Sequence, residues 1–383
     1  MGPQPPLRLT HHFRDLPDPR LGRLCRHELL DIIGIAICAV LCGQQTWADI
    51  AFYGQDHEAW LRTFLRLPNG IPSHDTFRYV FTRLDPAAFQ RCFGEWIAAL
   101  SAATGLTHLA IDGKTLRGSG ARAHGQAPLH LVSAWATARH VTLGQVAVAD
   151  KSNEITAIPR LLEILDVTGA VVTIDAMGCQ KEIAAPVRDA GADYVLAVKD
   201  NQPRLLADIQ ATVEAYLDQQ PDPDAACQLE TVDTGHGRRE VRTYVLLTDV
   251  SKIRDRALWP DLHALCFAVN QRTVAGETSL EARYYIGSLP GGVAAYAQVI
   301  RDHWSIETHC HWVLDVLFRE DGSRARRAQG AENLAWLRRM ALSLLKNDTT
   351  CERSLRAKSA KALGDHEFLL QLLSKVSGDK EGA

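Results

Sequence analysis

Several features that mark common protein classes are missing from this sequence of 383 residues. A membrane-spanning helix needs about 20 consecutive apolar residues, whereas the longest apolar run, Ile32–Cys42, has 11 residues and is typical of a buried helix. The nine cysteines never form Cys-x-x-Cys, which argues against a zinc ribbon or a disulfide framework. Met1–Leu9 has three prolines and no apolar core, so we expect no signal peptide and a cytoplasmic protein with reduced thiols.

An excess of charge is also missing, because the formal net charge is only -3. The net charge therefore does not indicate a polyanionic partner, and a binding site for such a partner must be a local cluster of basic residues. With 46% hydrophobic and 23% charged residues the chain is typical of a globular protein. Residues 298–361 have 12 basic and 8 acidic side chains, and the densest patch is Arg324, Arg326 and Arg327. This patch is interpreted as a phosphate-tracking surface, or else as a solvated helix face.

The apolar periodicity divides the chain into five parts. Residues 1–105 have helical spacing, with helices expected over 27–41, 46–65, 74–84 and 86–103. Residues 106–217 follow the order strand, strand, strand, helix, strand, helix, strand, helix. Residues 218–292 form a β-rich insertion, and residues 293–347 are helical, with helices expected over 294–318 and 331–347. Residues 348–383 form a polar, partly helical tail. This order predicts an α/β fold with a ribonuclease H-like mixed sheet, covered by helices on both faces and preceded by an all-α domain.

Two aspartates are placed where such a sheet would bring them together. Asp112 ends the apolar run 109–111, and Asp175 ends the run 171–174. The first and fourth strands are neighbours in the expected arrangement, so the two carboxylates should face each other. Their repulsion and burial would be relieved by a divalent cation such as Mg²⁺. Alternatively, each aspartate simply ends a strand and begins a turn.

A third acid is expected from a helix packed on the sheet. Glu307 is the strongest candidate, because Ile300, His303, His311 and Leu314 place it along a half-apolar stripe rather than on the solvated face. Three rivals follow it in the sequence: Asp315, Glu320 and Asp321, the last two expected to be solvated. Three such acids would support two-metal phosphoryl chemistry.

The sequence resembles the ISAs family of bacterial insertion-sequence transposases, the H-repeat-associated proteins. The resemblance covers residues 11–346 and rests on ordered blocks that include 13–20, 69–77, 110–119, 129–135, 151–155, 173–181, 192–202 and 303–316. It implies a DDE transposase whose catalytic, metal-binding triad is Asp112, Asp175 and Glu307, with Mg²⁺ or Mn²⁺ as cofactor. The family usually has Asn after the glutamate, where this chain has Thr308.

The resemblance also implies the partners. They are double-stranded DNA, namely the terminal inverted repeats of the element and the target DNA, and a second copy of the chain in a homodimer on DNA. The location expected is the bacterial cytoplasm, at the nucleoid. Two other functions stay open: a metal-dependent nuclease of the same fold that does not join DNA, and a catalytically silent DNA-binding protein derived from a transposase.

Basic residues near the acids are candidates for holding DNA. Lys114 and Arg117 follow Asp112 closely, and Lys199 and Asn201 follow the strand expected beside the site. Surface solvation is the alternative for all four. Gly113–Thr115 superficially resembles a phosphate-binding loop, but position 108 is His where that motif needs Gly, so no nucleotide cofactor is expected.

The expected helix over 74–84 is a candidate DNA reader. Its residues His74, Arg78 and Arg83 lie away from the apolar stripe. With the preceding helix and turn it fits a helix-turn-helix that reads terminal repeats, or an ordinary packing helix with exposed arginines.

Overall fold

The computed structural model describes residues 12–22, 25–101, 106–121, 125–148, 153–219, 227–235 and 237–374. Contacts divide the chain into two compact units. The first unit comprises Met1–Gly105, Gly113–Asp150 and Glu307–Ala383, and the second comprises Leu106–Asp112 and Lys151–Ile306. The helical N-terminal part and the C-terminal segment, which the sequence analysis separates, therefore belong to one unit.

The N-terminal part of the first unit is helical, as predicted. Its helices are α2 (Leu29–Leu41), α3 (Trp47–Asp56), α4 (Glu58–Leu61), α5 (His74–Phe81) and α6 (Pro86–Ser101). The single helix predicted over 46–65 is wrong, since α3 ends at a C-cap, His57, before α4 begins. Residues 32–41 of α2 are all buried, because α3, α12 and α13 pack around that helix.

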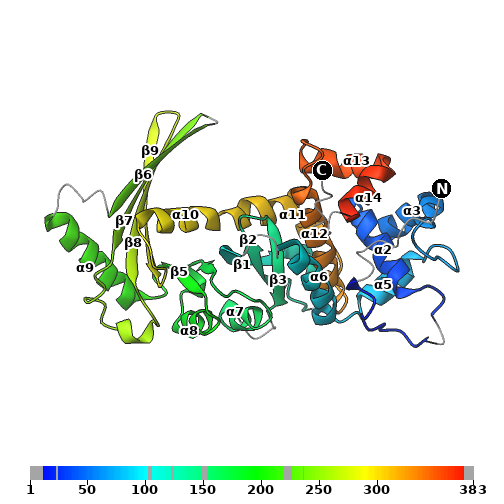
Figure 1. Ribbon diagram of the computed structural model, residues 1–383, viewed down its shortest axis with the longest axis horizontal. Coiled ribbons are helices and arrows are strands. Elements are labelled where there is room, and N and C mark those ends of the chain that lie inside the picture. Colours follow the sequence, from blue (N-terminus) through cyan, green and yellow to red (C-terminus); the bar gives the residue numbers. More distant parts are fainter. Residues whose placement is uncertain are drawn as a thin grey trace, which may run out of the picture. The chain divides into compact units, whose positions relative to one another are not determined.

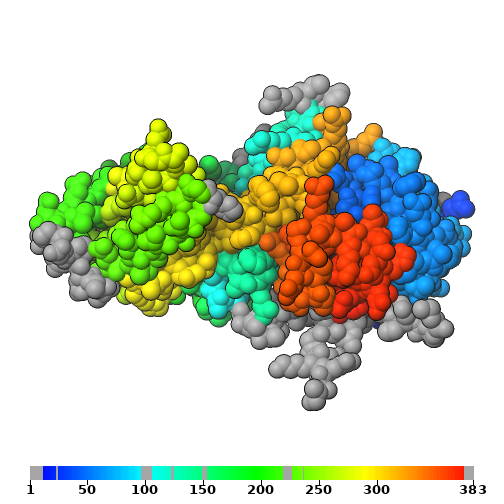
Figure 2. Space-filling view, turned by 90° about the horizontal axis from the view of Figure 1, so that it is seen from above, coloured from blue at the N-terminus to red at the C-terminus, as the bar shows by residue number. Residues whose placement is uncertain are grey.

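The C-terminal segment is also helical and packs in the same unit. Helix α12 (Gly330–Asn347) is buried along most of its length and contacts α2, α5 and α6. Helices α13 (Leu355–Gly364) and α14 (His366–Ser374) follow, and Phe368 and Leu369 of α14 are buried. Figure 2 shows these C-terminal helices, in orange and red, against the blue N-terminal helices.

Strand β1 (His108–Leu116) passes through both units. In the sheet it lies beside β2 (Leu129–Ala136), which pairs antiparallel with β3 (Val141–Ala147) in the first unit. In the second unit its first half pairs with β4 (Val171–Ile174) in parallel. The predicted neighbourhood of the first and fourth strands is thus confirmed.

The second unit extends this sheet. Its strand order is β1-β4-β5-β9-β8-β7-β6, with β5 (Asp193–Val198) parallel to β4 and antiparallel to β9 (Glu277–Gly287). The remaining strands are β6 (Gln228–Gly235), β7 (Arg238–Leu247) and β8 (Ala264–Val274), all antiparallel to their neighbours. The β-rich insertion therefore adds its strands to the core sheet, because β9 satisfies the backbone groups of β5 that would otherwise form an open edge.

Helices cover both faces of this sheet. Helix α10 (Val293–His303) packs on β4 to β7 (Figure 1). There Tyr296 and Ile300 join Val195 in one apolar cluster. Neighbours of Val195 along β5 point to the opposite face, where α8 (Lys181–Asp189) packs beside α7 (Glu154–Leu162). Helix α9 (Pro203–Gln219) follows β5. The mixed α/β fold class with a helical N-terminal region is confirmed.

The long helix predicted over 294–318 is interrupted. After α10 comes a π-helical segment, Ile306–His311, and then the short helix α11 (Trp312–Val316) and the 3₁₀ turn η7 (Glu320–Gly322). Among the described residues, no helix is both long and apolar enough to cross a bilayer.

Candidate active site

The two predicted aspartates lie side by side. The parallel pairing of β1 with β4 ends with Ile111 opposite Ile174, and Asp112 and Asp175 are the next residue on each strand. Neighbouring strands lie about 4.8 Å apart, so the two backbones hold the carboxylates at adjacent positions of one sheet edge. Strand β1 continues to Leu116, so Asp112 marks the end of the pairing with β4 rather than the end of the strand.

The surroundings of Asp175 have opposing effects on the pKa of its carboxyl group. Burial is the largest influence on the pKa of Asp175 and raises it, and the negative charges of Asp112 and Glu154 raise it further. The backbone N–H groups of Met177 and Gly178 oppose this by donating to Asp175 Oδ1, at 3.0 and 3.3 Å. Sequence analysis missed Glu154, which lies in the first turn of α7; its place directly after the helix N-cap was the available signal.

The turn after Asp175 is held from two sides. A Cβ at Gly178 would collide with the side chain of Ile174, so only glycine lets the 3₁₀ turn η4 (Ala176–Gly178) close under the carboxylate. Asn201, predicted as a DNA contact, donates from Nδ2 to the carbonyl of Ala176 at 2.7 Å. Asn201 therefore fixes the site loop, while Lys199 is exposed beside it.

A buried hydrogen-bonded chain lies beneath the aspartates. Thr173 Oγ1 is 2.9 Å from His108 Nε2 and 2.8 Å from His303 Nδ1, so it connects β1, β4 and the last turn of α10. Burial, with a smaller effect of His303, lowers the pKa of His108 to about 3. His108 is thus neutral at pH 7 and acts as a structural partner of the strand that holds Asp175.

Glu307 lies one helical turn beyond His303, the last residue of this hydrogen-bonded chain. His303 ends α10 against β4, and Glu307 comes four residues later, in the π-helical segment. Glu307 is exposed, so its predicted place on a half-apolar stripe is wrong. The wider π turn changes the faces that an ideal α-helix would give, and such segments often occur at functional sites.

The three rival acids have structural partners. Lys114 Nζ lies 2.8 Å from Asp315 and 3.2 Å from Asp321, and the Lys114 side chain is only 8% exposed. Glu320 pairs with Arg339 at 2.9 Å, and both side chains are 0% exposed. The expectation that Glu320 is solvated is therefore wrong, because α12 covers it and supplies its counter-charge.

The pairing of Lys114 also bears on its predicted role in DNA binding. Its ammonium contacts two carboxylates inside the first unit, so a phosphate would compete with them for Lys114. Arg117 lies 3.4 Å from Asp321 but is 83% exposed, so its guanidinium is available to a ligand.

The donor chemistry of the aspartate pair suits a hard divalent cation. Carboxylate oxygens are the ligands that Mg²⁺ and Mn²⁺ prefer, and a cation between Asp112 and Asp175 would offset the effects that raise the pKa of Asp175. Within the described ranges, no group of three or more His, Cys, Asp or Glu side chains is arranged to hold a metal. The described structure thus brings the carboxylates of Asp112 and Asp175 together, but no complete set of three.

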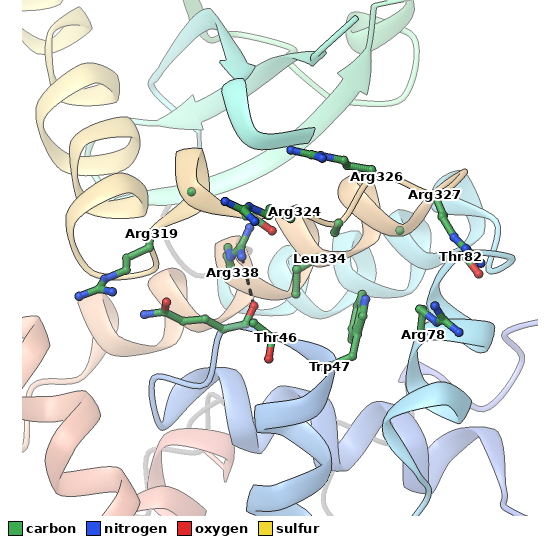
Figure 3. Close-up of a pocket in the computed structure, with 15 residues that line it drawn as sticks. Thr46, Trp47, Arg78, Thr82, Arg319, Arg324, Arg326, Arg327, Leu334 and Arg338 are labelled. Atoms are coloured by element: carbon green, nitrogen blue, oxygen red, sulfur yellow. Dashed lines mark hydrogen bonds between the residues drawn. The ribbon is translucent and has the colours of Figure 1, made fainter. Parts of the chain in front are cut away.

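The two predicted sets of DNA-contact residues meet in the first unit. Arg78 of α5 and the loop residues Arg324, Arg326 and Arg327 line one cavity of about 610 Å³ (Figure 3). Asn333 of α12 brings the elements together, because its Nδ2 donates to backbone carbonyls at the end of α5.

Helix α5 presents its polar side chains outward. Ser73 caps it by accepting from Thr76 N at 3.3 Å. His74 is exposed, and Arg83 lies over the ring of Tyr79, 3.8 Å from its centre. This placement agrees with either predicted role, a DNA reader or a packing helix with exposed arginines.

Comparison of the sequence with known proteins identifies its family. Residues 103–344 match the model described as "Transposase DDE domain", and residues 10–97 match the one described as "DDE_Tnp_1-associated". The chain is 36% identical to the "H repeat-associated putative transposase YhhI" of Escherichia coli over 372 residues, covering 96% of this chain and 98% of that protein. It is 42% identical to an uncharacterised Xanthobacter autotrophicus protein from the dhlA 3′ region, over 72% of this chain and 92% of that one.

Among solved structures, the piggyBac transposase in its synaptic complex with hairpin DNA aligns with a TM-score of 0.40 and 10% identity, covering 98% of this chain and 83% of that chain. The full-length match at 36% identity and the domain match over residues 103–344 agree with the resemblance seen in the sequence. This chain belongs to the DDE transposase family.

Proposed function

We propose that this protein is a metal-dependent DDE transposase that cuts DNA at the ends of an insertion sequence and joins those ends to target DNA. The carrying observation is the adjacent pair Asp112 and Asp175 at the end of the β1–β4 pairing, in a chain of the DDE family. Its substrates would be the terminal inverted repeats of the element and the target duplex, bound by a homodimer in the bacterial cytoplasm, at the nucleoid.

The third acid in this proposal is Glu307. Its rivals Asp315, Glu320 and Asp321 are held in ion pairs within the first unit. Glu307 is exposed and comes one turn after His303, the residue of α10 that contacts Thr173 of β4. When bound, Mg²⁺ or Mn²⁺ would activate the attacking oxygen and stabilise the leaving oxygen of an in-line displacement.

The residues of the chain have separate tasks in that reaction. Asp112 and Asp175 would hold the cation, and Glu307 would complete the site. Asn201 keeps the loop after Asp175 in place through its bond to the Ala176 carbonyl. The DNA backbone would be held by exposed basic side chains: Arg117, Lys199, His74, Arg78, Arg83, Arg324, Arg326 and Arg327.

A strand-transfer assay tests the proposal. The donor is a DNA that carries the sequences flanking the gene, and the products are read as nicked donor and as donor joined to target. Wild type should give both products with Mg²⁺, whereas Asp175→Asn and Glu307→Gln should lose at least 100-fold of each rate. Glu352→Gln, which removes an exposed carboxylate from the first unit, is the matched control and should behave as wild type.

Other outcomes assign the chain to the alternatives. Cleavage without joining would identify a nuclease, and binding without metal-dependent cleavage would identify a silent DNA-binding protein. Thermal unfolding gives an independent readout of the metal, because Mg²⁺ should raise the melting temperature of wild type and raise that of Asp175→Asn much less. An equal rise in both would contradict the assignment of the cation to this pair.

A further inference from the structure

The cavity of about 610 Å³ in the first unit has an unusual lining. Six arginines and no acidic residue line it within the described part of the chain. The arginines come from α5, from the segment before α12 and from α12 itself: Arg78, Arg319, Arg324, Arg326, Arg327 and Arg338. Guanidinium groups repel one another at close range, so a concave surface built from them is typical of a site for an anion.

The arginines point in different directions (Figure 3). Arg324 and Arg338 approach each other at one end of the cavity, and Arg327 and Arg78 lie near Thr82 at the other end. Arg319 points away from the rest, and Arg326 donates to the carbonyl of Gly118 at 3.0 Å. Arg78 also pairs with exposed Asp75 at 2.7 Å, so an anion at that end would share Arg78 with a carboxylate. Two pairs of guanidinium groups thus face the cavity, one at each end.

Arg338 is the strongest sign that the cavity is a built site. Its side chain belongs to a residue that is only 2% exposed, and burial lowers its pKa. Its hydrogen bond to the carbonyl of Gln45 is long, at 3.5 Å. The negative charges of Glu320 and Asp315 favour its charged form, whereas the positive charge of Arg339 opposes it. An anion in the cavity would offset the cost of burying this cation.

The cavity is too large for a phosphate alone and has an apolar wall. Sites for small organic ligands occupy about 300–1,000 Å³, and this one lies in that range. Trp47 and Leu334 line it between the two arginine pairs, and Trp47 is stacked on Phe81 at 5.0 Å between ring centres, so its ring is held in place. Phosphates on arginines and a base on an aromatic ring are the two contacts that proteins make with single-stranded nucleic acid.

A second cavity, of about 530 Å³, adjoins the first. Its lining includes Arg83, Tyr79 and the carboxylate of Asp75, and it shares Arg78, Thr82 and Arg327 with the first cavity. A ligand that occupies both would carry at least two phosphates in a row, which a strand of DNA does and an inorganic phosphate does not.

We infer that these two cavities bind consecutive unpaired nucleotides of a DNA strand, with the phosphates on Arg78, Arg324, Arg327 and Arg338 and a base against Trp47. The inference rests on the proposed function, because the strand would come from the DNA on which the protein acts. It adds a binding site for single-stranded DNA within the first unit.

Fluorescence anisotropy with a labelled 12-nucleotide single strand tests the inference. The full chain is used in buffer with EDTA, so the result does not depend on catalysis. Each phosphate contact on a single strand contributes about 0.7 to the slope of log K against log salt concentration. The variant Arg324→Ala/Arg327→Ala should lower the magnitude of this slope by about 1.4, since both side chains are exposed and their loss should leave folding intact.

The matched control is Arg353→Ala/Arg356→Ala. It removes the same charge from exposed positions of the same unit, outside both cavities, and should leave the slope unchanged. A strand of abasic sites should bind wild type roughly 5- to 150-fold more weakly than the normal strand, which is the range for one lost stacking contact. A fully paired duplex should lose less affinity than the single strand in the Arg324→Ala/Arg327→Ala variant.

Several results would overturn the inference. They are an equal loss of slope in both double variants, equal binding of abasic and normal strands, or binding of free dAMP at a site that the 12-mer does not compete for. If strand binding fails while metal-dependent cleavage of duplex DNA persists, the inference is wrong and the proposed function stands. If cleavage fails while strand binding persists, the proposed function is wrong and the binding site for single-stranded DNA stands.

Discussion

The buried ion pair between Glu320 and Arg339 supports the arginine-bearing loop, and its loss should be costly. Glu320→Gln leaves the Arg339 guanidinium buried without a counter-charge. Arg339 also donates to the carbonyl of Ala335 at 3.3 Å, but this neutral acceptor does not neutralise the charge. Removing one partner of such a pair costs about 3–5 kcal/mol. Because the glutamine amide oxygen can still accept one hydrogen bond, we expect a loss near the lower end, about 3 kcal/mol.

The same pair should be replaceable as a whole. Within the described residues, Glu320 Oε2 and Arg339 Nη2 are buried without a hydrogen-bond partner, so the pair is incompletely satisfied. Apolar side chains of similar volume often replace such a pair at no cost. The variant Glu320→Leu/Arg339→Met should therefore lie within about 1 kcal/mol of wild type or above it.

Urea unfolding followed by circular dichroism measures these differences, compared at equal m-values. The matched control is Glu58→Gln, which breaks the exposed pair with Arg62 at 2.6 Å in the same unit and should cost less than about 1 kcal/mol. The reasoning fails if Glu320→Gln costs no more than this control. It also fails if the double variant loses as much as the two single variants together.

Three further predictions concern the active site and helix α5. A carboxyl group whose pKa is raised by folding destabilises the fold at pH values above its unfolded pKa. Asp112→Asn removes one of the charges that raise the pKa of Asp175. It should therefore raise the melting temperature at pH 7. This gain should vanish as the pH falls below about 4, and a gain that is constant from pH 4 to 8 would refute it. Thr173→Val should lower the free energy of unfolding by about 1–3 kcal/mol, because His108 Nε2 loses its hydroxyl partner. Thr173→Ser keeps the hydroxyl group and should lower it by about 1 kcal/mol. Equal urea midpoints for the two variants would contradict this role of the hydroxyl group. Ser73→Ala should destabilise by about 1 kcal/mol through loss of the α5 cap, whereas Ser73→Asp should restore it in the same assay.

The element types and the positions of the aspartates could be predicted because they depend on local patterns. Short apolar runs that each end in a lone carboxylate specified β1 and β4, and their parallel pairing placed Asp112 beside Asp175. The predicted helix 46–65 failed at His57, and the predicted helix 294–318 failed at the π-helical segment. Both interruptions keep the apolar periodicity nearly intact, so the pattern cannot reveal them.

The partners of charged side chains could not be predicted, because they lie far apart in the sequence. Lys114 pairs with Asp315, which lies 201 residues further along the sequence. Asn201 similarly contacts the Ala176 carbonyl rather than solvent. Sequence reasoning sees that a basic residue is near an acid in the chain, but not which acid the fold brings to it.

The sequence by itself determined the fold class, the family and the two aspartates, since periodicity and short motifs are local properties of the chain. Only the tertiary structure decided which other charges are available. It buried Glu320 against Arg339, enclosed Lys114 between two carboxylates, and joined the arginines of α5 to those of the loop before α12 in one cavity. The physical reason is that burial and counter-charge, which decide whether an ionic group can meet a ligand, are set by contacts between residues hundreds of positions apart.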